Sequence, residues 1–130
     1  MSRRPYIRPL STTGWWLSEG RYVRYMMREL SSLFIGAFTL LLIFGLYRLS
    51  QGQVEFEAFV AMLLGPVGVA FALITFLFSV YHTYTWFQVT PKAMPIVVAG
   101  KRVPGFVIVA AHWLGFVVAS AVLWMLAVMN

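Results

Sequence analysis

Three long runs of the sequence contain no charged side chain, and they constrain the fold more than any other feature. They cover residues 30–47, 59–87 and 106–129, and each reaches the roughly 18 residues that a helix needs to cross a bilayer. Of all residues 61% are hydrophobic and only 11% are charged, whereas about a quarter are charged in an ordinary soluble domain. A chain of 130 residues encloses too little interior to bury so much apolar surface. The sequence therefore predicts an all-α integral membrane protein with three transmembrane helices.

The spacing of these runs predicts six consecutive parts of the chain. The second run would form a helix about 43 Å long, against a hydrocarbon core of roughly 30 Å, so we expect it to tilt or to kink at Gly65-Pro66. Prolines and glycines between the second and third runs exclude a continuous helix there. The expected parts are a basic N-terminal arm at 1–29, a transmembrane helix at 30–47, a periplasmic loop at 48–58, a transmembrane helix at 59–87, a cytoplasmic loop at 88–105, and a third transmembrane helix with the C-terminus at 106–130.

Lysine and arginine are distributed unevenly between the two ends of these helices. Nine stand before the first helix or between the second and third, and one stands in the other loop. Positive residues are retained on the cytoplasmic side, so the pattern predicts a cytoplasmic N-terminus and a periplasmic C-terminus. Because the charges gather at helix ends rather than over one soluble face, we expect no nucleic-acid partner. The nine are Arg3, Arg4, Arg8, Arg21, Arg24, Arg28, Lys92, Lys101 and Arg102, and the tenth is Arg48.

The sequence contains no cysteine, which excludes a disulfide, a thiolate metal site and iron–sulfur ligation by this chain. It also contains no glycine-rich phosphate loop and no H-E-x-x-H motif. The motifs typical of soluble enzymes are therefore absent. A redox cofactor would need its histidines or a partner chain.

Ionisable side chains at membrane depth are the most informative candidates, because each costs about 2.5 kcal/mol or more unless it is paired or hydrated. Arg28 and Glu29 stand at the cytoplasmic entrance of the first predicted helix, and His82 stands near the cytoplasmic exit of the second. The predicted topology therefore brings Glu29 and His82 to the same side of the membrane. The structural alternative is that Arg28 and Glu29 extend to the interface and pair with nearby charges.

A polar face on the second helix accompanies His82. Thr75, Ser79, His82 and Trp86 are spaced by four, three and four residues, which places them on one side of a helix. With a carboxylate and an arginine at matching depth, imidazole and indole groups would suit a quinone head group, whose oxygens need hydrogen bonds and whose redox chemistry moves protons. The alternative is that His82 bonds a neighbouring helix and Trp86 belongs to the interfacial aromatic belt.

His112 lies six residues into the third run, at a depth similar to that of His82. Two histidines at equal depth on adjacent helices are a possible ligand pair for a b-type haem. His112 also adjoins the small residues Ala111, Gly115 and Ala119, which favour close helix packing, so a packed histidine bonded across helices is the expected outcome.

Several sequence segments carry a family resemblance. They are Arg4-Pro5-Tyr6-Ile7-Arg8-Pro9, Trp15-Trp16, Tyr25-Met26-Met27-Arg28-Glu29, and His82-Thr83-Tyr84-Thr85-Trp86-Phe87 with Pro91-Lys92-Ala93. In this order, and with three apolar runs in a chain of this length, they resemble the C subunit of bacterial fumarate reductase. The third run matches mainly by position and hydrophobicity, and His112 has no counterpart in the family pattern.

The resemblance implies a multi-pass anchor in the bacterial inner membrane. In that family the C subunit joins a D-type anchor subunit and holds a flavoprotein subunit and an iron–sulfur subunit at the cytoplasmic side. The complex oxidises menaquinol and reduces fumarate in anaerobic respiration. FAD and the iron–sulfur clusters belong to the partner subunits, and haem b is not expected in the anchor.

By position, the resemblance gives Glu29 the role of quinol proton acceptor, with Arg28 beside it, and places His82 and Trp86 in the quinone-binding site. Two alternatives keep the same class of complex: a haem-b-binding anchor, or a purely structural anchor, of a succinate:quinone oxidoreductase. A small transporter ranks last, because no polar cluster lies at the midplane of a predicted helix.

Overall fold

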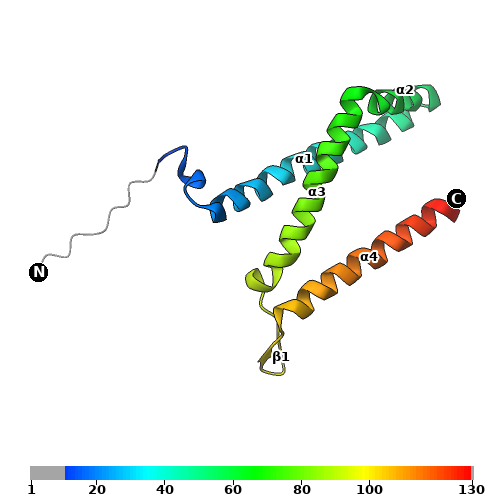
Figure 1. Cartoon of the computed structure of the whole chain (residues 1–130). Helices are drawn as coiled ribbons and strands as arrows, with labels where there is room; N and C mark the ends of the chain where they lie inside the picture. Colours follow the sequence, from blue (N-terminus) through cyan, green and yellow to red (C-terminus); the bar gives the residue numbers. More distant parts are fainter. Residues whose placement is uncertain (1–10, 130) are drawn as a thin grey trace, which may run out of the picture. The chain divides into compact units, whose positions relative to one another are not determined.

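The computed structural model describes residues 11–129 and is largely helical (Figure 1). Within these residues, three helices are long and apolar enough to cross a membrane, which confirms the expected number. Arg3, Arg4, Arg8 and the segment at residues 4–9 lie outside the described residues. The elements are the 3₁₀ helix η1 (Trp15–Leu17), α1 (Gly20–Ser50), α2 (Gln53–Leu64), α3 (Pro66–Ala93), β1 (Val97–Val98), β2 (Lys101–Arg102) and α4 (Gly105–Met129), of which α1, α3 and α4 have spanning length.

The chain divides into two compact units, Met1–Phe78 and Ser79–Asn130, and the division falls within α3. The first unit contains η1, α1, α2 and the beginning of α3. The second contains the end of α3, the short hairpin and α4. In a bilayer the helical form is required of all three long segments, because only a helix satisfies its own backbone hydrogen bonds without water.

The second apolar run does not form the single kinked helix expected at 59–87. α2 ends at Leu64, and α3 begins at Pro66 and continues to Ala93. Gly65 between them is extended, with ψ of 162°. Proline disfavours the helical conformation of the residue before it, while its own fixed φ suits the first position of a new helix. Gly65-Pro66 is therefore a break between two helices, and residues 59–64 belong to the shorter one.

The expected loop at 48–58 is largely helical as well. α1 continues to Ser50, and α2 begins at Gln53 after a turn in which Gly52 has φ of 119°, a conformation that favours glycine. The Arg48 guanidinium pairs with the Glu55 carboxylate across this turn. Two charges that were expected in an irregular loop thus connect the end of one helix to the first turn of the next.

Within the first unit, aromatic side chains join α1 to the beginning of α3. The Phe34 ring stacks on that of Phe78 with centroids 4.6 Å apart, and the Phe38 and Phe71 rings are 6.2 Å apart. Ser31 on α1 and Thr75 on α3 are buried polar residues of small volume. The Ser31 hydroxyl donates to the Arg28 carbonyl oxygen at 2.5 Å, so its burial leaves no unsatisfied hydroxyl.

The second unit contains a short antiparallel hairpin within the region expected as an irregular loop at 88–105. α3 extends through Pro91 to Ala93, and the strands pair Val97 with Arg102 and Val98 with Lys101. Ala99 and Gly100 have φ of 51° and 76°, the left-handed pair that a two-residue hairpin turn requires. Pro91 lies inside the last turn of α3, where it has no N–H to donate to the helix backbone.

Candidate functional site

Arg28 and Glu29 lie on α1, in the first unit, shortly before the buried Ser31. Glu29 is exposed and Arg28 is half-buried. The Ser32 hydroxyl donates to the Glu29 carbonyl oxygen at 2.6 Å, so this serine is held by the helix backbone. The Glu29 carboxylate therefore projects from a regular and internally bonded helix.

The basic side chains before Glu29 share one face of α1. Arg21, Arg24 and Arg28 are spaced by three and four residues, which aligns them along a helix. Arg21 pairs with Glu19, its Nη2 lying 2.6 Å from the carboxylate. One face of the first turns of α1 is thus basic, and the helix carries no charged residue from Leu30 to Tyr47.

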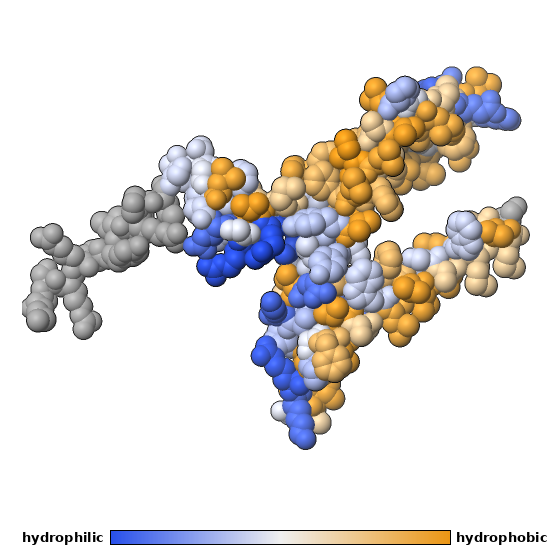
Figure 2. Space-filling view, in the orientation of Figure 1, coloured by the Kyte–Doolittle hydropathy of each residue, from blue (hydrophilic) through white to orange (hydrophobic). Residues whose placement is uncertain are grey.

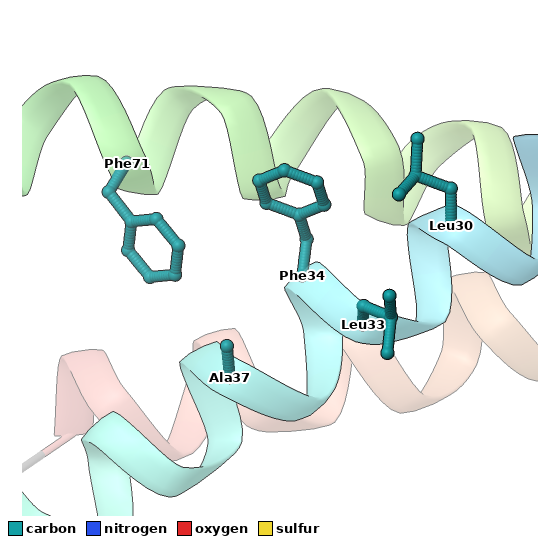
Figure 3. Close-up of a pocket in the computed structure, with 5 residues that line it drawn as sticks. All are labelled: Leu30, Leu33, Phe34, Ala37 and Phe71. Carbon is teal, nitrogen blue, oxygen red and sulfur yellow. The ribbon is translucent and has the colours of Figure 1, made fainter.

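An apolar cleft opens directly after Glu29, between α1 and the beginning of α3. We call it the α1–α3 cleft. Figure 3 shows Phe34 pointing from α1 toward α3 and Phe71 pointing from α3 back toward α1. The cleft has a volume of about 310 Å³ and is shallow and widely open. Its lining residues are Leu30, Leu33, Phe34, Ala37 and Phe71.

Sequence reasoning did not single out this cleft, although part of it has a sequence signal. The α1 residues that line it follow helical spacing from Leu30 to Ala37, which places them on one face. The contribution of Phe71 has no such signal, because it depends on how α3 packs against α1. Chemically, the cleft offers a hydrocarbon surface that begins one residue from a carboxylate.

His82 and Trp86 lie on the part of α3 that belongs to the second unit. Their ring centroids are 6.1 Å apart, with His82 half-buried and Trp86 42% exposed. The Thr85 hydroxyl donates to the carbonyl oxygens of Tyr81 and His82, at 2.9 and 3.1 Å. An imidazole and an indole therefore neighbour each other on one helix face and can both take part in hydrogen bonding.

The structure places Arg28 with Glu29 and His82 with Trp86, one pair in each unit. The two pairs belong to different units, so the meeting of Glu29 with His82 stays a prediction from the spanning topology. That topology depends on the charge asymmetry and on α1 and α3 each having spanning length.

The hydrogen bond of His112 lies within its own helix, where the sequence predicted a bond across helices. Its Nδ1 lies 2.7 Å from the carbonyl oxygen of Ile108, four residues earlier on α4, and its ring lies 5.2 Å from that of Phe87. His82 precedes Phe87 by five residues and so lies about 140° away around α3. The face of α3 that packs on His112 is therefore not the face that carries His82. This arrangement does not fit a haem held between the two histidines.

Among residues 11–129, no group of three or more histidine, cysteine or acidic side chains is arranged to hold a metal ion. The candidate chemistry of this part of the chain thus rests on a carboxylate, an arginine, an imidazole and an indole.

These features define a multi-pass α-helical membrane protein in which the helix that carries Glu29 also lines an apolar cleft. The chain matches the family model for the C subunit of fumarate reductase over residues 1–128. It therefore belongs to the fumarate reductase C-subunit family, whose members are membrane anchors, and this confirms the resemblance carried by its motifs.

Individual relatives agree with this assignment. The chain is 35% identical to the fumarate reductase C subunit of Yersinia enterocolitica (serotype O:8, biotype 1B) over 127 residues, covering 98% of this chain and 97% of the relative. It is 34% identical, over the same shares, to the fumarate reductase C subunits of Yersinia pestis strain Pestoides F and Yersinia pseudotuberculosis serotype O:1b.

Proposed function

We propose that this chain anchors a fumarate reductase in the bacterial inner membrane and contributes to a menaquinol oxidation site near the cytoplasmic face. In this assembly it docks the flavoprotein and iron–sulfur subunits together with a D-type anchor subunit. Family membership supports the anchor role, since the chain matches the C-subunit model over nearly its full length. The complex would serve anaerobic respiration by passing electrons from menaquinol to fumarate.

The observation that carries the quinol site is the position of Glu29. Its exposed carboxylate stands one residue before the α1–α3 cleft, which is lined by apolar side chains. Menaquinol combines a head group that releases protons with a long hydrocarbon tail. A carboxylate on the helix that lines an apolar cleft matches both parts of such a molecule.

The proposed roles follow from the chemistry of each side chain. Oxidation of a quinol releases two electrons and two protons, and the Glu29 carboxylate accepts the proton of one head-group hydroxyl while the proton of the other passes to cytoplasmic water. Arg28, one residue earlier, belongs to the same quinone-binding site. His82 and Trp86 donate or accept hydrogen bonds at the quinone oxygens and hold the ring in place. The electrons pass to the iron–sulfur subunit, because this chain has no cysteine to bind a cluster.

The orientation that this function requires agrees with the distribution of charge. Of the ten basic residues, six precede α1 or stand in its first turns. Three more lie between the second and third apolar runs. The positive-inside rule then places Glu29 and the hairpin on the side of the cytoplasmic subunits, and the α1–α2 turn on the periplasmic side.

The test replaces Glu29 in the assembled complex and separates quinol-linked from dye-linked turnover. We expect Glu29→Leu to lower quinol-driven fumarate reduction by about 10²-fold or more, the typical contribution of a positioned proton acceptor. Fumarate reduction driven by an artificial dye, and recovery of all subunits by intact-mass analysis, stay near wild type.

Glu57→Leu is the matched control, since it removes an exposed carboxylate of α2 that hydrogen-bonds Gln53 at 2.7 Å and lies away from the cleft. Unchanged quinol-linked turnover in Glu29→Leu would remove Glu29 from the mechanism. If Glu29→Leu instead lost its partner subunits together with both the quinol-linked and the dye-linked activity, the result would support a purely structural anchor. Purification of the chain without partner subunits would refute the anchor proposal itself.

A further inference from the structure

The second unit carries positive charge with no acidic side chain of its own. Residues 79–130 contain Lys92, Lys101 and Arg102 but no aspartate or glutamate. The four acidic residues of the chain, Glu19, Glu29, Glu55 and Glu57, all belong to the first unit. No side-chain carboxylate within the second unit can therefore neutralise its three cations, and their counter-charge comes from outside it.

Two of these cations line a cleft where α3 ends and α4 begins. Lys92 contributes from the last turn of α3 and Arg102 from β2, and the cleft has a volume of about 470 Å³. Gly105 permits this close junction, because a Cβ at that position would lie 3.3 Å from the Cβ of Pro91. The complete lining is Pro91, Lys92, Arg102, Val103, Pro104 and Gly105.

An apolar groove along α4 adjoins this basic cleft. A second cavity of about 580 Å³ shares Pro91, Lys92 and Gly105 with the first and extends as far as Trp113. From Gly105 to Trp113 the distance along the helix is about 12 Å. The Trp113 ring is held edge-on against Phe87, with centroids 5.1 Å apart. The further lining residues are Gln88, Phe106, Val109 and Ala110.

We propose that these two connected cavities, here called the basic–apolar cleft, bind one anionic phospholipid. The headgroup phosphate lies between Lys92 and Arg102, and an acyl chain follows the groove along α4 toward Trp113. Basic pockets at the ends of transmembrane helices are typical sites for anionic lipid head groups. Figure 2 shows hydrophilic colours at the hairpin and mostly hydrophobic colours along α4.

A lipid fits this cleft better than an acidic protein segment because of the groove. A soluble partner would supply negative charge at Lys92 and Arg102, but it would leave the surface of Phe106, Val109 and Trp113 uncovered. Those residues belong to a helix of spanning length, so hydrocarbon is their natural neighbour. A phospholipid carries both a phosphate, which matches the basic side chains, and an acyl chain, which covers the apolar groove.

The test measures phosphatidylglycerol retained on the full chain, extracted with whatever subunits accompany it, by native mass spectrometry after exchange into phosphatidylcholine. Lys92→Gln and Arg102→Gln should each lower the affinity for phosphatidylglycerol about fivefold, the effect of about 1 kcal/mol for each basic residue near a membrane surface. Lys101→Gln is the control, because it removes the same charge from a neighbouring residue that does not line the cleft. Equal losses in all three variants would overturn the proposal in favour of diffuse surface charge.

A further variant separates a lipid from a simple anion. Ala110→Phe fills the groove without changing the charge, and Ala110 is exposed, so the substitution leaves the helix intact. We expect this variant to lose phosphatidylglycerol at least as strongly as Lys92→Gln. Normal retention in Ala110→Phe, together with displacement of the lipid by inorganic phosphate, would reduce the cleft to an anion site. Loss of accompanying subunits in Lys92→Gln with unchanged lipid retention would show a protein-docking surface instead.

Discussion

Phe59 of α2 packs against Gly45 of α1 so closely that a Cβ on the glycine would lie 2.5 Å from Cε1 of the ring. Phe59 is 6% exposed, and the ring of Phe44 meets it edge-on with centroids 5.9 Å apart. In a membrane, where apolar surface gains little by leaving lipid, such close packing is a main source of attachment between helices. The Gly45–Phe59 contact therefore holds α2 along the end of α1.

This contact predicts a large effect for a single added methyl group. Gly45→Ala should displace Phe59 and lower the stability of the protein in detergent by about 1–3 kcal/mol, the usual cost of overpacking. Gly36→Ala is the control on the same helix, since nothing lies within 4 Å of its added Cβ. It should leave the stability unchanged or raise it by up to about 1 kcal/mol. Thermal unfolding followed by circular dichroism measures both, and equal melting temperatures would contradict the packing argument.

The α1–α3 cleft predicts a dependence on the tail of the quinol. Ala37→Phe fills the cleft and should raise the KM for a long-tailed menaquinol about tenfold, the loss of roughly two buried methylene contacts. The KM for a short-tailed analogue should change little, because its head group is held elsewhere. Leu40→Phe, at an exposed position outside the cleft, serves as the control. Equal changes for both substrates would exclude the tail from this cleft.

We expect the removal of the Trp86 indole to weaken binding of the quinol head group. Trp86→Phe keeps an aromatic ring near His82 but removes the N–H donor. The KM for quinol should rise about fivefold, as for one hydrogen bond of about 1 kcal/mol. Trp124→Phe makes the same change on α4, where the ring is 72% exposed, and should have no effect. Steady-state kinetics of the assembled complex measure the KM for quinol. A wild-type KM in Trp86→Phe would show that Trp86 does not bind the head group and would favour its assignment to the interfacial aromatic belt.

We expect a substitution of His112 to change the stability of the protein and not its quinol-linked turnover. His112→Phe removes the contact with the Ile108 carbonyl, worth about 1 kcal/mol, while an aromatic ring against Phe87 is retained. Quinol-linked turnover should stay within about twofold of wild type, because the residue faces Phe87 rather than the His82 side of α3. A dithionite-reduced spectrum of the complex is the second readout. A haem band that disappears in His112→Phe would identify this histidine as an axial ligand and overturn the assignment.

The sequence by itself predicted the number of spanning helices and the family of the chain. Both depend on local signals: uninterrupted apolar runs, and motifs such as His82 with Trp86 at fixed spacing. It also placed Gly65-Pro66 as an irregularity, since the restriction that proline imposes on its predecessor is local. The candidate residues Arg28, Glu29, His82 and Trp86 were likewise chosen from charge, depth, helical spacing and the family motifs.

Only the tertiary structure showed that Gly65 ends one helix before Pro66 begins another, and that the shorter helix packs on α1 through Phe59 and Gly45. It likewise showed that Phe71 completes the α1–α3 cleft and that Lys92 and Arg102 line the basic–apolar cleft. Hydropathy records the preference of each residue for lipid over water, and nearly every residue of these helices shares that preference. Which of them meet is decided by the shapes of side chains from distant parts of the chain, and no local pattern encodes that fit.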